Sequence, residues 1–398
     1  LVGSEMCIRD SDMSQSLYDH YPENTDTNVL KNEAEISPED YPKDDGQLSQ
    51  YVDDFMCGED KGAGVFKELL SALRFKASPD DDDEPGEVGR FVGSTWGGVN
   101  DPPDAEGIYR YWAEQVKYVE TFVKSSEEVI QNKTGKQLKH AETPAIAHDQ
   151  KDNTKELDET PGVFADVAPS IVCALLYVAR SSRLDVLYAV CRLTRYLTKW
   201  MLRQDQWLIR VLGYLKATKH YKLNFQIYPP DFEEGGNGEF ENWSDADLGG
   251  DPPTKKSTSG GLGLLVGSKT RALVHAHCKR QGQTAISTPE SETVAMVVLG
   301  KKVIPQHMML QRLLKRNVKL SYKGDNSASE RVIGTGVSAA LAYMKRTAGV
   351  SLRWAKENMS AFVGLVSTKI NIADIFTKAL EKDCLLYTSP SPRDATLS

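Results

Sequence analysis

Four acidic residues in the C-terminal part of the chain have the types and spacing that could hold metal ions. Two end or follow strand-like runs and two lie in helical patterns; they are Asp245, Asp325, Glu292 and Asp374. Four carboxylates brought to one point would repel one another unless cations lay among them. Two Mg²⁺ ions would offset that repulsion and activate water for in-line attack on a phosphodiester. The ordered set predicts a site, whereas each acid alone is typical of a protein surface.

The stretch SDADLGGDPPTKKSTSGG, residues 244–261, allows three interpretations: a calcium loop, a turn between strands, or part of a metal site. A calcium loop of the EF-hand type that began at Asp245 would need a bidentate glutamate at its last position, where Lys256 stands. Asp, Gly and Pro favour a turn over residues 247–254. We therefore interpret the stretch as a turn attached to one metal ligand, Asp245.

The elements that must position these acids follow from the hydropathy pattern. Strand-like runs and two helical patterns alternate through the C-terminal part, and together they predict an α+β domain with a mixed sheet. Upstream, helical patterns dominate, and residues 109–130 predict an amphipathic helix. The strands are expected at 240–246, 258–267, 270–278, 318–324 and 361–367, and the helices at 168–179, 182–200, 205–218, 288–316 and 372–380.

Charge and hydropathy narrow the class of partner. Residues 1–160 hold 36 acidic and 16 basic side chains, whereas residues 161–398 hold 20 acidic and 32 basic ones. A basic segment on an acidic chain favours a polyanionic partner, although a solvated basic face has the same composition. The longest apolar run, at 171–179, has about half the length of a membrane span, so we expect no membrane partner.

The motifs WSDADLGGD, KKSTSGG, AISTPESETVAM, GDNSAS and IADIFTKAL, in this order, closely resemble the ribonuclease H domain of copia-type retrotransposon polyproteins. Upstream, YVDDFM resembles the end of the reverse transcriptase of that family. The resemblance implies an α+β fold: an RNase H-like mixed five-stranded sheet with flanking helices, preceded by a partial reverse transcriptase palm and a helical connection. Both ends of the chain resemble translated sequencing adapters.

The resemblance also implies a division into segments. We expect an adapter-like start with a disordered acidic segment (1–47), a partial reverse transcriptase palm (48–145), a linker with a helical thumb or connection (146–228), the RNase H-like domain (236–382) and an adapter-like tail (383–398). A cytoplasmic location in a virus-like particle, or a nuclear one, would suit such a protein. The remainder of the retroelement polyprotein is an expected partner.

The activity implied by the resemblance is hydrolysis of the RNA strand of an RNA–DNA hybrid. Asp245, Glu292, Asp325 and Asp374 would be the catalytic acids and would bind two Mg²⁺ ions, with Mn²⁺ as a possible substitute. Asp247 and Glu290 would flank the site without being primary ligands. Asp53 and Asp54 would be a vestigial polymerase pair, and we expect no polymerase activity, because no strand bearing a third aspartate is evident before Tyr51.

Recognition of RNA requires groups that sense 2′-hydroxyls, and binding of the backbone requires cations. We expect polar residues beside the acids to serve the first role and basic residues at the end of the long helix to serve the second; they are Ser287, Thr288, Ser291, Asn326 and Ser327, and Lys315 and Arg316. No histidine follows His307, where many relatives have a histidine that helps to release product. The alternative is therefore a catalytically dead nucleic-acid-binding remnant of a retroelement.

Overall fold

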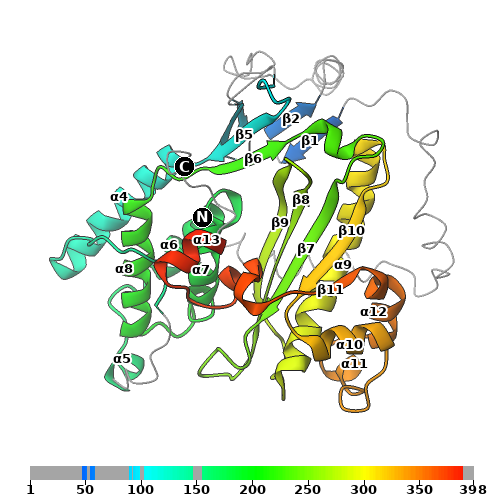
Figure 1. Ribbon diagram of the computed structural model, residues 1–398. Coiled ribbons are helices and arrows are strands. Elements are labelled where there is room, and N and C mark those ends of the chain that lie inside the picture. Colours follow the sequence, from blue (N-terminus) through cyan, green and yellow to red (C-terminus); the bar gives the residue numbers. More distant parts are fainter. Residues whose placement is uncertain are drawn as a thin grey trace, which may run out of the picture.

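The computed structural model describes residues 47–51, 54–58, 89–91, 93–98, 103–146 and 155–388 (Figure 1). The strands are β1 (Gln47–Tyr51), β2 (Asp54–Gly58), β3 (Gly89–Phe91), β4 (Ser94–Gly98), β5 (Tyr109–Glu114), β6 (Leu223–Ile227), β7 (Glu239–Ala246), β8 (Thr258–Val266), β9 (Arg271–Arg280), β10 (Lys319–Gly324) and β11 (Val363–Leu365).

The α-helices are α4 (Val116–Thr134), α5 (Lys155–Glu159), α6 (Ala168–Ser181), α7 (Leu187–Thr194), α8 (Leu202–Ala217), α9 (Thr288–Leu314), α10 (Ser327–Thr335), α11 (Met344–Thr347), α12 (Leu352–Met359) and α13 (Lys382–Thr388). Short 3₁₀ segments are η3 (Leu184–Val186), η4 (Pro229–Phe232), η5 (Ser360–Phe362), η6 (Thr368–Ile370) and η7 (Ile372–Phe376). In this part of the chain, no helix combines the length and the apolar character that crossing a bilayer requires.

One mixed sheet organises most of the described chain. Its strand order is β11-β10-β7-β8-β9-β6-β5-β4-β3, with β7, β8 and β9 antiparallel and with β10 and β11 parallel to β7. The predicted mixed α+β class is confirmed, but the sheet has nine strands in place of the expected five. The difference arises because β6 pairs with the first residue of β9, which joins β3, β4 and β5 to the same sheet.

The segment 109–130 differs from the single helix that its pattern predicts. Residues 109–114 form β5, which pairs with both β4 and β6, and the helix α4 begins only at Val116. The strand sequence YRYWAE is rich in aromatic residues, which favour a half-buried pleated surface. Tertiary pairing with β4 and β6 therefore replaces the first turns of the expected helix.

Helices cover both faces of the sheet around β7 and β8. Phe240 and Trp243 lie three positions apart on β7, so they point to opposite faces. Phe240 packs in a cluster with α9, α10 and α12, whereas Trp243 packs in another with α6, α7, α8 and η7. This two-sided packing makes the end of β7 a rigid support for Asp245.

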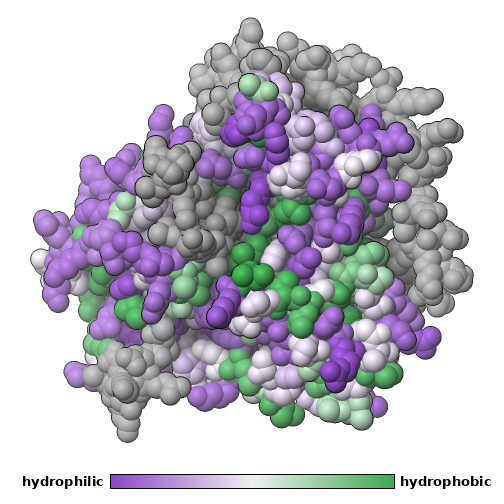
Figure 2. Space-filling model, viewed as in Figure 1, coloured by the Kyte–Doolittle hydropathy of each residue, from purple (hydrophilic) through white to green (hydrophobic). Residues whose placement is uncertain are grey.

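The surface over η7 and β11 is less polar than the surface over α4 and α8. Figure 2 shows hydrophobic side chains in the centre of the view, over η7 and β11, and hydrophilic ones over the α4 and α8 side. Phe362, Leu365 and Ile370 are 44%, 50% and 57% exposed, respectively. The segment that carries Asp374 therefore lies beside apolar surface.

Candidate metal centre

The strand β7 delivers Asp245 to a buried position, where its side chain lies opposite Gly260 of β8. A Cβ atom on Gly260 would lie 2.7 Å from Cγ2 of Thr377 and 2.8 Å from Cβ of Phe376. A side chain there would push away the segment that carries Asp374. The first glycine of the motif STSGG is therefore required for the close approach of η7 to β7.

Asn371 fixes the start of η7 against β7. Its side-chain Nδ2 donates to the carbonyl of Ser244 at 3.0 Å, and its Oδ1 accepts from the backbone N–H of Ala373 at 3.1 Å. The Asn371 side chain also hydrogen-bonds the Asp325 carboxylate. One buried amide thus ties together the three segments that carry the three aspartates.

Three of the predicted acids meet at one edge of the sheet. Asp325 directly follows β10, whose parallel pairing with β7 brings both strand ends to the same edge. One carboxylate oxygen from each of Asp245, Asp325 and Asp374 lies within 4.8 Å of the other two. We call these three residues the aspartate triad.

Glu292, in the second turn of α9, adjoins the aspartate triad but is not among its mutually close oxygens. Its carboxylate accepts a hydrogen bond from the backbone of Ala246, the residue after Asp245. It also lines a small hollow together with Gly324 and Asn326. The fourth predicted acid therefore neighbours the cluster without completing it.

Burial and mutual repulsion shape the protonation of these acids. Burial, reinforced by the charges of Asp245 and Asp325, raises the pKa of Glu292 to about 9. Burial and the charge of Asp245 likewise raise the pKa of Asp374 to about 6 and raise the pKa of Asp325. The cluster therefore holds more negative charge than its surroundings neutralise. Its oxygen-only donor set fits a hard divalent cation such as Mg²⁺ or Mn²⁺.

Two donors that sequence reasoning did not single out reach into the aspartate triad. The Thr377 hydroxyl donates to Oδ2 of Asp245. The Lys378 ammonium lies 2.9 Å from Oδ1 of Asp374 and 4.0 Å from Oδ2 of Asp245. Burial acts to lower the pKa of Lys378, but the neighbouring carboxylates hold it above its ordinary value. The sequence offered one sign of their role, because Thr377 and Lys378 follow Asp374 by three and four positions in the same motif.

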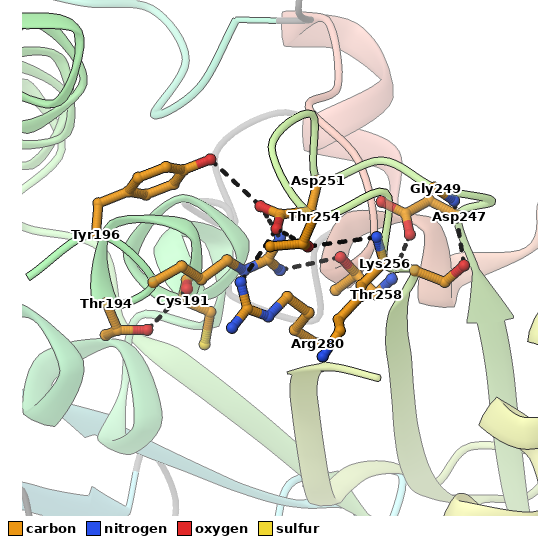
Figure 3. Close-up of polar contacts among 12 residues, drawn as sticks. Cys191, Thr194, Tyr196, Asp247, Gly249, Asp251, Thr254, Lys256, Thr258 and Arg280 are labelled. Carbon is orange, nitrogen blue, oxygen red and sulfur yellow. Dashed lines mark hydrogen bonds and ion pairs between the residues drawn. The ribbon is translucent and has the colours of Figure 1, made fainter. Parts of the chain in front are cut away.

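The loop after Asp245 is held by contacts of a different kind (Figure 3). Oδ1 of Asp247 accepts from the backbone N–H of Thr258, which closes the turn. The Asp251 carboxylate lies 3.5 Å from Arg195 and 3.1 Å from Arg280, and it accepts from the Tyr196 hydroxyl at 3.3 Å. Arg195 and Tyr196 directly follow α7, so this buried ion pair ties the loop to the upstream helices.

The two acids that the resemblance places beside the site are both engaged elsewhere. Burial raises the pKa of Asp247 to about 6, and its carboxylate serves the turn at Thr258. Glu290 accepts from the backbone N–H of Ile286 and from the Tyr343 hydroxyl, each at 2.7 Å. Neither belongs to the group of mutually close oxygens in the described residues.

The residues expected to sense RNA fall into two groups. Ser287 precedes α9, Thr288 and Ser327 are exposed, and Asn326 caps α10 by accepting from Ser329 at 2.9 Å. Ser291, in contrast, is fully buried, and its hydroxyl donates to the Thr288 carbonyl at 3.0 Å. Its complete burial leaves it unavailable to a 2′-hydroxyl.

The remaining predicted residues lie away from the aspartate triad. Lys315 and Arg316 are exposed after the end of α9, roughly 35 Å along the helix axis from Glu292 at a rise of 1.5 Å per residue. The strands β1 and β2 pair antiparallel and form a separate two-stranded sheet. Asp54 begins β2, and Asp53 lies outside the described residues.

Comparison with known proteins identifies relatives for most of the chain. It is 28% identical over 286 residues to the Retrovirus-related Pol polyprotein from transposon TNT 1-94 of Nicotiana tabacum, across 69% of this chain and 19% of that protein. It is 33% identical over 127 residues to Secreted RxLR effector protein 161 of Plasmopara viticola, across 32% of this chain and 82% of that protein.

No protein-family model matches the sequence. The chain spans about a fifth of the length of the tobacco polyprotein. That likeness covers 69% of the present chain. The likeness to a retrotransposon Pol polyprotein supports a retroelement-derived protein that is similar to the copia-type LTR retrotransposon polyproteins.

Proposed function

We propose that the protein is a ribonuclease H that hydrolyses the RNA strand of RNA–DNA hybrids. The observation that carries the proposal is the aspartate triad, in which β7, β10 and η7 bring three carboxylates to one edge of the sheet. The run β9-β8-β7-β10-β11, antiparallel and then parallel, supports the RNase H-like arrangement that the sequence resemblance implies. Similarity to a retrotransposon Pol polyprotein is consistent with such an activity.

The residues of the site would have different roles in metal binding and catalysis. Asp245, Asp325 and Asp374 would hold the ions, and the Thr377 hydroxyl would fix the orientation of the Asp245 carboxylate. Glu292 holds a proton at neutral pH in the free protein, because its pKa is raised to about 9, and it would release that proton as cations enter. Bound Mg²⁺ would supply activation of a water molecule and stabilisation of the leaving oxygen.

The hybrid would be recognised beside the aspartate triad. Thr288 and Ser327 are exposed near Glu292 and Asp325, where hydroxyl groups can meet the 2′-hydroxyls that only RNA offers. The excess of basic residues after position 160 would provide attraction to phosphates. Binding should therefore weaken steeply as salt concentration rises. The remote cations Lys315 and Arg316 could contact only a more distant part of the duplex.

The test is cleavage of a labelled RNA–DNA hybrid by the full chain in Mg²⁺. The RNA strand of the hybrid should be cut, and RNA duplex and DNA duplex should remain intact. Asp325→Asn should abolish cutting, whereas Asp166→Asn should not, because that acid is exposed and pairs with Lys133 far from the triad. Hybrid binding without any cleavage would contradict the proposal and favour the catalytically dead binding remnant.

A further inference from the structure

Lys378 differs from the other lysines that pair with acids in the described part of the chain. Lys133, Lys319 and Lys382 each face a single carboxylate residue. The Lys378 ammonium faces two members of the aspartate triad, at 2.9 Å and 4.0 Å. Among the described residues, no other lysine or arginine forms an ion pair with the triad. Lys378 is thus the resident cation of the cluster.

The position of Lys378 suggests that it can leave the cluster. Its side chain is 44% exposed, whereas the side chains of Asp245 and Asp374 are only 5% and 15% exposed. A lysine side chain is a flexible stem that carries a compact charge with rotatable donors. Thr377 donates to the Asp245 carboxylate and the Asn371 side chain hydrogen-bonds the Asp325 carboxylate, whereas the Lys378 ammonium is held by its contacts with Asp374 and Asp245 at the end of a flexible stem. The uncharged donors to Asp245 and Asp325 would remain in place if the ammonium moved.

Two divalent cations among these carboxylates would occupy the space that the ammonium now fills. They would also neutralise the negative charge that the ammonium now neutralises. Like charges at such separations repel strongly in a partly buried site. The ammonium would then be driven toward solvent, at the rim where the phosphate backbone of a bound strand would pass. A phosphate oxygen is a suitable partner for a lysine ammonium.

We propose that Lys378 is a mobile counter-ion of the aspartate triad, competing with divalent cations in the free protein and moving to a substrate phosphate once they are bound. This inference rests on the proposed function of the same site. It assigns one residue two opposite effects, because Lys378 weakens the binding of ions and strengthens the binding of nucleic acid.

The first measurement is the affinity of the full chain for Mn²⁺ in the absence of nucleic acid. Binding is detected by electron paramagnetic resonance as a loss of the signal of free Mn²⁺. Lys378→Met should bind Mn²⁺ about tenfold more tightly than the wild type, because the competing charge is gone. Lys378→Arg keeps the charge and should resemble the wild type. Lys382→Met is the matched control, since Lys382 lies four positions on and pairs with Glu142 outside the triad.

The second measurement is the affinity for an RNA–DNA hybrid in the presence of Ca²⁺. It is determined by fluorescence anisotropy at several salt concentrations. Lys378→Met should bind the hybrid several-fold more weakly, and its salt dependence should fall by about one phosphate contact. Lys378→Arg should restore both. A merely structural lysine would not combine tighter ion binding with weaker hybrid binding in one variant.

The outcomes separate this inference from the proposed function. Equal or weaker Mn²⁺ binding by folded Lys378→Met would overturn the competing role. Tighter Mn²⁺ binding with unchanged hybrid affinity would overturn the phosphate contact. A wild-type chain that binds Mn²⁺ but never cuts the hybrid would contradict the nuclease proposal while leaving the competition intact. If Asp245→Asn bound Mn²⁺ with the same affinity as the wild type, the aspartate triad would not be the site of Mn²⁺ binding.

Discussion

Asp245 and Asp251 lie six positions apart, and both are almost completely buried, with 3% and 2% exposed. The surroundings of Asp251 are cationic, because Arg195 and Arg280 contact its carboxylate. Burial acts to raise the pKa of Asp251, but the Thr254 hydroxyl and the two guanidinium groups hold it below the ordinary value. The surroundings of Asp245 are mainly anionic, and its charge raises the pKa of its acidic neighbours.

The contrast shows how two buried aspartates of the same segment can serve different ends. A buried carboxylate whose partners cancel its charge contributes to structure, and removing it leaves those partners uncompensated. A cluster with excess negative charge is destabilised by itself and gains from a cation supplied from outside. Burial alone therefore does not mark a functional acid. The balance of charge around the carboxylate distinguishes the two cases.

The largest expected effect comes from Asp245→Asn. Cleavage of the hybrid should fall at least about 1,000-fold, equivalent to about 4 kcal/mol in activation free energy, because a ligand of the metal centre is lost. The melting temperature without metal should stay equal or rise, since repulsion within the aspartate triad is relieved. Cleavage assays and thermal unfolding of the same preparation test both halves. A cooperative unfolding transition at a much lower temperature would show that Asp245 stabilises the fold as Asp251 does.

Asp251→Asn should show the reverse pattern. The substitution leaves the guanidinium of Arg195, whose side chain is 6% exposed, without its compensating charge. We expect a loss of about 3 kcal/mol in the free energy of unfolding, measured by urea denaturation. At a temperature where the variant is folded, Mn²⁺ should bind as in the wild type. If Asp251→Asn lost Mn²⁺ binding while its free energy of unfolding was unchanged, Asp251 would belong to the proposed metal centre. It would then not differ in role from Asp245.

The free energy of unfolding between pH 7 and pH 9 tests whether the acidic cluster around Asp245 carries uncompensated charge. The pKa of Glu292 rises from 4.5 to about 9 on folding, so the folded protein binds a proton that the unfolded chain has released. Raising the pH through this window should therefore lower the free energy of unfolding, by at most about 1.4 kcal/mol per pH unit. Urea denaturation in chelator should reveal the slope.

Glu292→Gln provides the control for that slope, which should largely disappear in the variant. The buried histidines do not interfere, because burial lowers the pKa of His275 to about 4 and that of His277 well below its ordinary value of 6.5. Their effect on stability appears only as the pH falls below about 6.5, where unfolding becomes linked to proton uptake. An unchanged slope in Glu292→Gln would show that another group titrates.

The smallest expected effect belongs to Tyr196→Phe. The Tyr196 hydroxyl donates to Asp251 at 3.3 Å, and the two arginines remain in the variant. Loss of one such hydrogen bond should lower the free energy of unfolding by about 0.5–1 kcal/mol, with no change in cleavage. A double-mutant cycle with Asp251→Asn measures the coupling. Zero coupling energy would indicate that the tyrosine is a bystander of the ion pair.

Several parts of the fold were predictable because their signals are local. The alternating and helical patterns located β7, β8, β9, β10 and α9 to within a few residues. The expected helix at residues 109–130 was wrong at its start, because pairing with β4 and β6 decides the conformation of residues 109–114. The strand β6 and the extension of the sheet to nine strands depend on partners more than 100 residues away in the chain.

The candidate site was predictable to a similar degree. Asp245, Asp325 and Asp374 were identified from the order of the motifs, and the structure brings them together. Ser291 has the right type and spacing for an RNA contact but is completely buried, since the packing around α9 decides which of its residues are covered. Lys378 was overlooked because its importance lies in a distance to Asp245, 133 positions earlier, and not in its own pattern.

The residue types, the strand and helix periods near the site, and the order of motifs that relates the chain to retrotransposon polyproteins are all readable in the sequence. Which buried aspartate has its charge compensated, and which does not, depends on the folded arrangement of distant segments. Asp245 and Asp251 share one segment and one residue type, yet the partner of Asp245 directly follows η7, whereas the partners of Asp251 come from the residue after α7 and from β9. Charge compensation depends on distances in space, and local sequence does not encode those distances.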